Sequence, residues 1–277
     1  LHEAIALFEQ NLEDRTRTLG LDHPETLASR HSLAGAYRDA GRLDEAIPLF
    51  EQNLTDFIRV LGPDRPDTFT SRSTLAGAYQ AAGRLEEAIP LFEQNLEDSI
   101  RVLGPDHPDT LTARNTLAGA YRAASRLDEA ITLYEQVFSG RSRVLGPDHR
   151  STLTTRDQLA ATYWEAGRLD EAITLYKQIL DDSLRIMGAD SPGASTARLK
   201  LADAYRDAGR LDEAVNMLKQ NLDDVARTLA LDHPDTLTAR NRLAVAYRDA
   251  GRLDEAIPLF EQNLTDVTRL AGPDHPE

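Results

Sequence analysis

Histidine is the residue in this chain whose recurrence first suggests chemistry, because its ring can bind a metal or carry a proton near neutral pH. Five of the seven histidines occupy equivalent loop positions: His23, His107, His149, His233 and His275. One ring per loop closes a metal site only if neighbouring loops approach within a few Å, whereas packed helices lie about 8–10 Å apart. We therefore expect no metal site, and we expect loop acids such as Asp106 and Asp109 to cap helices rather than to bind calcium.

Charged and amide side chains also recur inside stripes that are otherwise apolar. The arginines are Arg30, Arg72, Arg114, Arg156, Arg198 and Arg240; the asparagines are Asn11, Asn53, Asn95, Asn221 and Asn263; the aspartates are Asp14, Asp56, Asp98, Asp182, Asp224 and Asp266. They could form a basic row for an acidic ligand or internal ion pairs. Since a half-buried guanidinium needs a carboxylate partner, we favour internal ion pairs.

The third copy of this pattern lacks both polar partners. Val137 and Gly140 stand there in place of asparagine and aspartate. We expect Arg114 to pair instead with Asp98 on the preceding helix, and the equivalent arginines to pair with the preceding helix as well.

No catalytic constellation is present in the sequence. The chain has no cysteine, which excludes disulfides, thiolate nucleophiles and cysteine-bound zinc. It also lacks the glycine-rich phosphate-binding motifs, the H-E-x-x-H metalloprotease motif and the G-x-S-x-G nucleophile motif. We expect a protein that is not an enzyme and that needs no cofactor.

The charge balance limits the partners. The chain carries 46 acidic and 31 basic residues, a formal net charge of −15. This disfavours nucleic acid and anionic membrane surfaces. No apolar run approaches the roughly 20 residues that cross a bilayer, and no signal peptide opens the sequence. Together with the lack of cysteine, these features predict a cytoplasmic protein.

These residues are positioned by a sequence repeat with a constant period of 42. The clearest marks are Tyr37, Tyr79, Tyr121, Tyr163, Tyr205 and Tyr247, and Ala46, Ala88, Ala130, Ala172, Ala214 and Ala256. The register divides the chain into a half repeat, six full repeats and the start of another: 1–22, 23–64, 65–106, 107–148, 149–190, 191–232, 233–274 and 275–277. Because the chain begins and ends within a repeat, we expect it to be a piece of a longer array.

Each repeat is predicted to form two helices. In the first full repeat, apolar residues recur at helical spacing over 27–37, here named helix A, and over 43–61, named helix B. Gly41 and Gly62 should end these helices, and Pro66 should begin the next helix A.

Two local features test this prediction. Ser125 occupies the position at which the other repeats carry a glycine, so we expect it to adopt the left-handed conformation at a steric cost of roughly 1–2 kcal/mol. Prolines inside helix B (Pro48, Pro90 and Pro258) should each remove one backbone hydrogen bond. Short connections make antiparallel helix pairs, and stacking them predicts an all-α fold, a right-handed α-solenoid or superhelix.

The repeat resembles the tetratricopeptide repeat. The sequence Leu33-Ala34-x-x-Tyr37 followed by Ala46-x-x-x-Phe50 matches the pattern L-G-x-x-Y and A-x-x-x-F of that family, and the match recurs in all six full repeats. The period of 42 and the L-G-x-D-H-P-D-T type of linker are similar to the kinesin light chain type. They are also similar to near-identical bacterial arrays, especially actinobacterial ones, that often form the sensor of STAND-type signalling ATPases.

One feature of kinesin light chains is only partly present. Those proteins line their groove with an asparagine-rich T-L-N-N-L-A segment. The first of these asparagines corresponds here to His31, Ser73, Asn115, Asp157, Leu199 and Asn241. Only two of the six positions match, so the sequence does not predict a kinesin-type cargo peptide.

The resemblance implies a concave ligand-binding face lined by the A helices. Its candidate residues are Thr70, Thr112, Asn115, Arg122, Asp157, Trp164, Glu165, Asp203, Arg206, Asn241 and Arg248. Variation between repeats gathers at 149–232, where it reflects either function or drift. Trp164, the single tryptophan, replaces a long polar residue there, and we hypothesise that it anchors a ligand between Arg122 and Arg206. The alternative is that it covers a packing defect.

The resemblance therefore implies a protein- or peptide-binding scaffold or sensor module, as part of a larger signalling protein. The alternative is a self-association module that binds copies of its own chain and no foreign ligand. The oligomeric state in dilute solution distinguishes the two.

Overall fold

The repeat folds into helices throughout the part of the chain that the structure describes. The computed structural model describes residues 2–230 and 233–271, which form thirteen helices and no strand. Contacts between helices divide the chain into two compact units, residues 1–152 and 153–277. The predicted all-α repeat solenoid is confirmed.

The helices alternate between 16-residue A helices and B helices of 18 or 19 residues. The first unit contains α1 His2–Leu19, α2 Pro24–Asp39, α3 Leu43–Leu61, α4 Pro66–Ala81, α5 Leu85–Leu103, α6 Pro108–Ala123 and α7 Leu127–Val144. Helix α8, Arg150–Glu165, begins at its end. The second unit continues with α9 Leu169–Met187, α10 Pro192–Asp207, α11 Leu211–Thr228, α12 Pro234–Asp249 and α13 Leu253–Ala271.

Histidine rings cap the starts of the A helices. The Nδ1 atoms of His23, His107 and His233 accept hydrogen bonds from the backbone N–H two residues later, at 3.2–3.3 Å. The expectation that the loop acids form these caps is wrong. The residue before the proline occupies the capping position, so Asp106 lies one residue too early and Asp109 two residues too late. His275 lies outside the described residues.

The glycines at the end of helix A adopt the left-handed conformation predicted for them, with φ of 75° at Gly41. Ser125 adopts it too, with φ of 58°, and it is the only residue other than glycine with positive φ among those described. Helix α3 runs through Pro48 without a break, although a proline in the second turn cannot donate to the carbonyl of Asp44.

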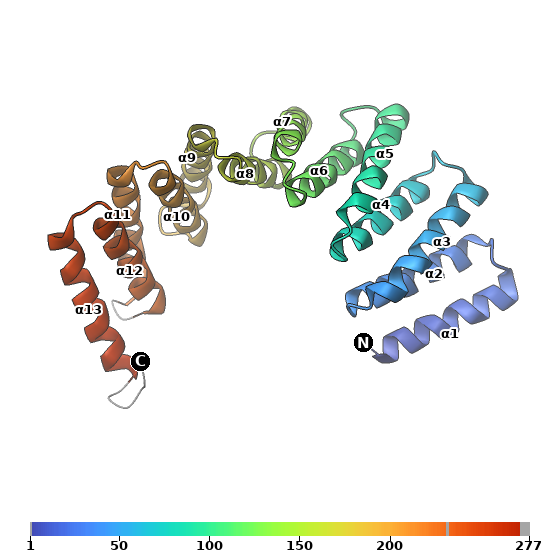
Figure 1. The fold of residues 1–277 in the computed structure, drawn as a ribbon, viewed down its shortest axis with the longest axis horizontal. Helices are drawn as coiled ribbons and strands as arrows, with labels where there is room; N and C mark the ends of the chain where they lie inside the picture. Colours follow the sequence, from blue (N-terminus) through green and yellow to red (C-terminus); the bar gives the residue numbers. More distant parts are fainter. Residues whose placement is uncertain (1, 231–232, 272–277) are drawn as a thin grey trace. The chain divides into compact units, whose positions relative to one another are not determined.

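Consecutive helices pack against one another within each unit. The contacting pairs run from α1·α2 to α6·α7 and from α9·α10 to α12·α13, and Figure 1 shows these neighbours side by side in chain order. Between them lies a continuous core of alanine, leucine, isoleucine, phenylalanine and tyrosine side chains. The hydroxyls of Tyr37, Tyr79 and Tyr121 each donate to a glutamate of the preceding helix B, as in the bond of 2.5 Å from Tyr37 to Glu9.

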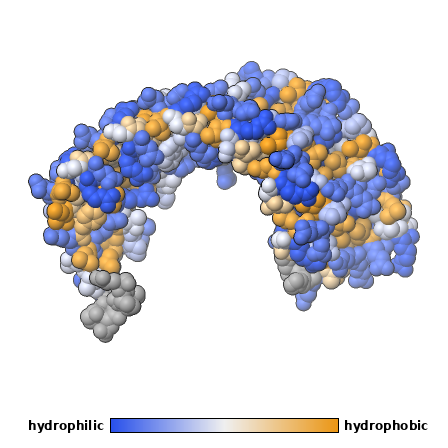
Figure 2. Space-filling view, in the orientation of Figure 1, coloured by the Kyte–Doolittle hydropathy of each residue, from blue (hydrophilic) through white to orange (hydrophobic). Residues whose placement is uncertain are grey.

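The visible surface is mostly hydrophilic, with hydrophobic residues in bands along the helices (Figure 2). Within the described residues, no helix is both long and apolar enough to cross a membrane. No group of three or more histidine, cysteine or acidic residues within that part of the chain could hold a metal ion.

Candidate functional site

The buried arginines of the A helices form ion pairs, and these pairs lie within each repeat. The pairs are Arg30–Asp56 at 2.5 Å, Arg72–Asp98 at 2.8 Å, Arg198–Asp224 at 2.6 Å, Arg240–Asp266 at 2.7 Å, and Arg156–Asp182. The interpretation as internal ion pairs is confirmed. The expected partner was wrong, because each arginine pairs with the B helix of its own repeat and not with the preceding one.

A second arginine joins these pairs, and in the first, second and fifth full repeats a loop aspartate completes a network of four charges. Arg59, three residues after Asp56, donates to that carboxylate at 2.9 Å and also to Asp22 in the loop before helix A. Burial raises the pKa of Asp56, but hydrogen bonds from Arg59 and Arg30 outweigh it and leave the pKa below its usual value. Each aspartate therefore bridges two arginines, and the network belongs to the scaffold.

The third full repeat departs from this network. Arg114 is only 8% exposed and makes no ion pair with any described carboxylate. Its one hydrogen bond within the described chain is a long contact of 3.5 Å from Nη1 to the carbonyl of Pro105, and its Nε has no partner. The expected pair between Arg114 and Asp98 is absent, because Asp98 is bound by Arg72 and Arg101.

The eleven predicted groove residues all lie on A helices, and none is fully buried. By helix they are Thr70 on α4; Thr112, Asn115 and Arg122 on α6; Asp157, Trp164 and Glu165 on α8; Asp203 and Arg206 on α10; and Asn241 and Arg248 on α12. The A helices therefore present these side chains at the surface, as a binding face requires. Their role in binding stays a prediction.

In the first unit, two of these residues share a depression between neighbouring A helices. Thr70 and Thr112 line a cavity of about 310 Å³ whose floor includes Phe69 and Asn95. Both threonines are exposed, while Phe69 is buried. The aromatic ring thus fills much of the space between the two A helices and the B helix behind them.

In the second unit, three predicted residues line one small cavity. Asp203, Arg206 and Asn241 surround a space of about 190 Å³ together with Arg242 and Val245. Asp203 pairs with Arg206 at 3.1 Å and with Arg242 at 3.7 Å. This face is therefore polar and carries charges that pair with one another.

A larger cavity of about 500 Å³ lies between α10, α11 and α12, and sequence reasoning missed it. It occupies the same register as the Thr70–Thr112 cavity, three repeats later. Its floor carries Ser195 where Phe69 lies in the first unit, so the aromatic ring is absent. The signal was available: the equivalents of Ser195 are Leu27, Phe69, Leu111, Leu153 and Leu237, all large and apolar.

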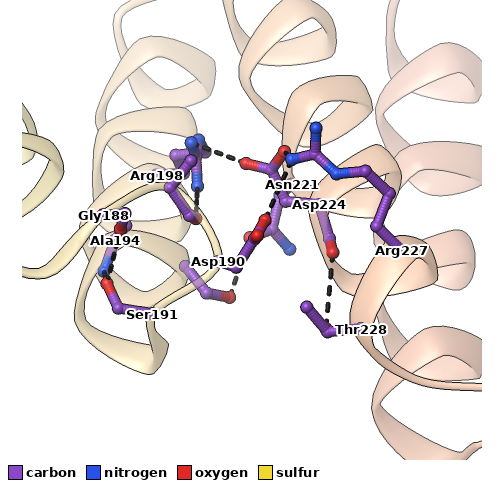
Figure 3. Close-up of polar contacts among 11 residues, drawn as sticks. Gly188, Asp190, Ser191, Ala194, Arg198, Asn221, Asp224, Arg227 and Thr228 are labelled. Atoms are coloured by element: carbon purple, nitrogen blue, oxygen red, sulfur yellow. Dashed lines mark hydrogen bonds and ion pairs between the residues drawn. The ribbon is translucent and has the colours of Figure 1, made fainter.

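Polar contacts hold the walls of this larger cavity in place (Figure 3). The hydroxyl of Ser195 donates to Oδ1 of Asn221 at 2.8 Å, and Ser191 caps α10 by accepting from the N–H of Ala194 at 3.2 Å. Asp224 bridges Arg198 and Arg227, as in the other repeats. Leu199, Val225 and Leu229 contribute apolar surface to the lining, which also includes Thr196, Thr228 and Thr238. The cavity is thus mostly apolar, with fixed polar groups at its edges.

Trp164 lies on the same helix face of the second unit and is half-buried. Its indole N–H donates to Asp207 of the next A helix at 2.9 Å, and its ring packs edge-on against the core residue Tyr176, with centroids 6.3 Å apart. Asp157 makes a parallel bridge to Lys200 at 2.6 Å. Trp164 therefore contributes to packing between repeats while part of its ring stays accessible.

The A-helix faces of the two units differ in the size and charge of their side chains. One outward position carries Gly35, Gly77 and Gly119 in the first unit, but Asp203 and Val245 in the last two repeats. A second position changes from serine and threonine in the first unit to Lys200 and Arg242. The second unit thus has the distinctive surface, and we regard it as the candidate site.

The chain matches a family model described as Tetratricopeptide repeat in six overlapping segments. They cover residues 1–55, 31–97, 67–142, 115–185, 159–225 and 193–265. No curated protein matches the chain.

Solved structures agree with the family match. The nearly identical TPR-like repeats of a kinesin light chain-type protein from Podosopora anserina share 33% identity and a TM-score of 0.68, covering 75% of this chain and 99% of that one. BtubC from P. vanneervenii shares 20% identity over 85% of this chain and 94% of that one, with a TM-score of 0.61. MamA protein shares 15% identity over 77% and 99%, with a TM-score of 0.53. The last two show likeness of fold alone.

Proposed function

Because the chain belongs to the tetratricopeptide repeat family, whose fold generally serves as a protein-interaction scaffold, we propose that it binds a partner peptide on the A-helix face of residues 153–277. In this proposal the peptide places one large apolar side chain in the cavity between α10, α11 and α12. Its flanking residues lie along Trp164 and the charged residues of α10 and α12. The array serves as a sensor or scaffold module of a larger cytoplasmic signalling protein.

The observation that carries the proposal is the replacement of a core leucine or phenylalanine by Ser195. Deleting a large side chain from a packed interior is destabilising, because the space that remains forfeits contacts. Here the space stays open at about 500 Å³, within the usual size range of ligand pockets, which is roughly 300–1,000 Å³. An apolar side chain from a partner would restore the lost contacts.

The surroundings favour a peptide over a small polar molecule. Leu199, Val225 and Leu229 provide an apolar lining for a side chain of the peptide. Arg242 and Asp235 also line the cavity and can bind polar or charged groups of the neighbouring peptide residues. Trp164 adds a partly accessible aromatic surface of the kind that concentrates binding energy in protein interfaces.

The test begins with peptides selected from a random display library against the folded chain. The affinities of the selected peptides are then measured for the wild-type chain and for the variant Ser195→Phe. This variant places a phenylalanine ring in the cavity, at the position that Phe69 occupies in the first unit. Leu237→Phe is the matched control, because it makes the same residue type at the equivalent position of α12, outside the cavity lining. We expect Ser195→Phe to weaken binding at least about tenfold and the control to change it little.

Two outcomes would overturn the proposal. If selected peptides bind both variants as tightly as the wild type, the cavity does not bind the peptide. If no peptide is enriched and sedimentation shows a concentration-dependent oligomer that Ser195→Phe disrupts, the face binds a second copy of the chain instead.

A further inference from the structure

The third full repeat contains an incomplete charge network around Arg114, away from the A-helix face described above. In the second full repeat, one carboxylate joins two arginines: Oδ2 of Asp98 accepts from Arg72 at 2.8 Å, and Oδ1 accepts from Arg101 at 2.8 Å. Both arginines have counterparts in the third repeat, Arg114 and Arg143. The carboxylate does not, because Gly140 occupies its position.

Removing the carboxylate leaves Arg114 without the ion pair that its counterparts form. In the second repeat, the network of Arg72, Arg101, Asp98 and Asp64 has two charges of each sign. In the third repeat Asp106 and Glu135 line the same cavity as Arg114 and Arg143, but neither carboxylate forms an ion pair with Arg114. Asp106 pairs with Arg143 and does not approach Arg114 within ion-pair distance.

Arg114 itself shows what is missing. It is more than nine-tenths buried, and its Nη1 makes only the long contact of 3.5 Å to the carbonyl of Pro105. The equivalent Arg198 makes both contacts, to the carbonyl of Ala189 at 3.2 Å and to Asp224 at 2.6 Å. Burial without a carboxylate lowers the pKa of Arg114 from its ordinary value. A buried guanidinium in this state is costly unless an anion joins it.

The structure leaves room for such an anion. A cavity of about 420 Å³ is lined by Arg114, Arg143 and Asp106 together with Glu135, Gln136, Ser139 and Gly140 of α7. A methyl group of Leu111 lies 2.6 Å from where a Cβ on Gly140 would be, so the leucine fills the path along which the aspartate of other repeats enters. A ligand therefore reaches the two arginines from the surface side of the cavity.

We propose that Arg114 and Arg143 bind a carboxylate supplied from outside the chain, in the place that an aspartate occupies in the other repeats. A carboxylate is the group that the geometry favours, because in those repeats one such group accepts from both arginines, one oxygen to each. This site is separate from the A-helix face, and it does not depend on peptide binding there.

The test uses acetate as the probe, with sodium chloride at matched ionic strength as the reference for screening. The signals of the arginine Nε–H groups are followed by NMR during the titration. We expect a saturable shift at Arg114 with acetate and not with chloride. Gly140→Asp, which supplies the carboxylate internally, should weaken the response at least about tenfold. Asp98→Gly is the reciprocal variant and should create an acetate response at Arg72.

Gly140→Asp should fold once Leu111 shifts, because the first repeat carries the same pair of residue types, Leu27 and Asp56, at these two positions. Equal responses to acetate and chloride, or an unchanged acetate affinity in Gly140→Asp, would overturn the proposal. A capped tetrapeptide of glutamates identifies the source of the carboxylate. If it binds more tightly than acetate at equal carboxylate concentration, the ligand is an acidic side chain of a partner; if it binds no more tightly, the ligand is a free small carboxylate.

Discussion

The second and third full repeats, residues 65–106 and 107–148, share 27 of their 42 residues and form equivalent pairs of helices, yet only the second pairs its buried arginine with a carboxylate. From residue 95 the second repeat reads Asn-Leu-Glu-Asp-Ser-Ile, and the third reads Val-Phe-Ser-Gly-Arg-Ser from residue 137. Both segments form the middle of a B helix, α5 and α7. The six substitutions leave the backbone helical while removing two carboxylates, those of Glu97 and Asp98, and adding an arginine.

This difference shows which parts of the repeat determine the fold. The alanines, leucines and tyrosines that pack one helix on the next are retained in both repeats and are buried in both. The Arg–Asp pair is lost in the third repeat without loss of the helices, so it is not required to form them. The loss of the aspartate leaves a buried arginine without its ion pair, which is a cost to stability rather than to helix formation.

Replacing the buried arginines should change the stability of the two repeats by very different amounts. Arg72→Met removes a guanidinium that is 1% exposed and leaves Asp98 with Arg101 alone, which should lower the free energy of unfolding by about 3 kcal/mol. Arg114→Met removes a guanidinium with no carboxylate and keeps its apolar stem, so it should lower the free energy by less than about 1 kcal/mol or raise it. Urea denaturation followed by circular dichroism measures both. Equal losses would show that Arg114 has a partner in solution.

The helical architecture was predictable because it rests on local signals. The period, the start of an A helix at Pro66 and the left-handed conformation of Ser125 each follow from residue types within a few positions. The packing partner of Arg30 was not predictable in this way. Asp14 and Asp56 occupy equivalent positions in adjacent repeats, so the sequence alone does not distinguish them as partners of Arg30. Which of the two contacts the guanidinium of Arg30 depends on how the helices are rotated relative to one another.

The sequence predicted which face of the molecule would carry the candidate site, but it did not predict the cavity at Ser195. Placing the ligand face on the A helices follows from the family resemblance, and all eleven residues lie there. The cavity at Ser195 depends on one small residue among six equivalents, and its volume depends on whether neighbouring side chains move in to fill it. The histidine caps were missed because histidine ranks below serine and aspartate as a capping residue.

Ser125 gives an intermediate effect within the same pair of repeats. Its counterpart in the second repeat is Gly83, and both have positive φ, 58° and 74°. Since a side chain is strained there, Ser125→Gly should raise the free energy of unfolding by about 1 kcal/mol. The reciprocal Gly83→Ser should lower it by a similar amount. Thermal melting of both variants checks this, and an unchanged or lower melting temperature for Ser125→Gly would contradict it.

The smallest effect concerns the loop aspartates at the outer end of each network. Asp64 pairs with Arg101, which also holds Asp98, whereas Asp106 is the only carboxylate that Arg143 meets among the described residues. Asp106→Asn should therefore lower the midpoint of urea denaturation more than Asp64→Asn does. Both pairs are exposed, so both differences should shrink as salt is added. A larger loss for Asp64→Asn would show that the missing carboxylate of the third repeat has no influence on Arg143.

The pH dependence of urea denaturation gives a separate test of the ion pair between Asp64 and Arg101. The hydrogen bond from Arg101 lowers the pKa of Asp64 below its usual value, although slight desolvation opposes this. A lowered folded-state pKa means that the contribution is complete above the unfolded pKa of about 3.9 and is lost as the pH falls through the folded-state pKa. The wild type should therefore lose stability on acidification below about pH 4 more steeply than Asp64→Asn, and the two midpoints should converge. Parallel pH profiles would show that the pair with Arg101 contributes nothing to stability in solution.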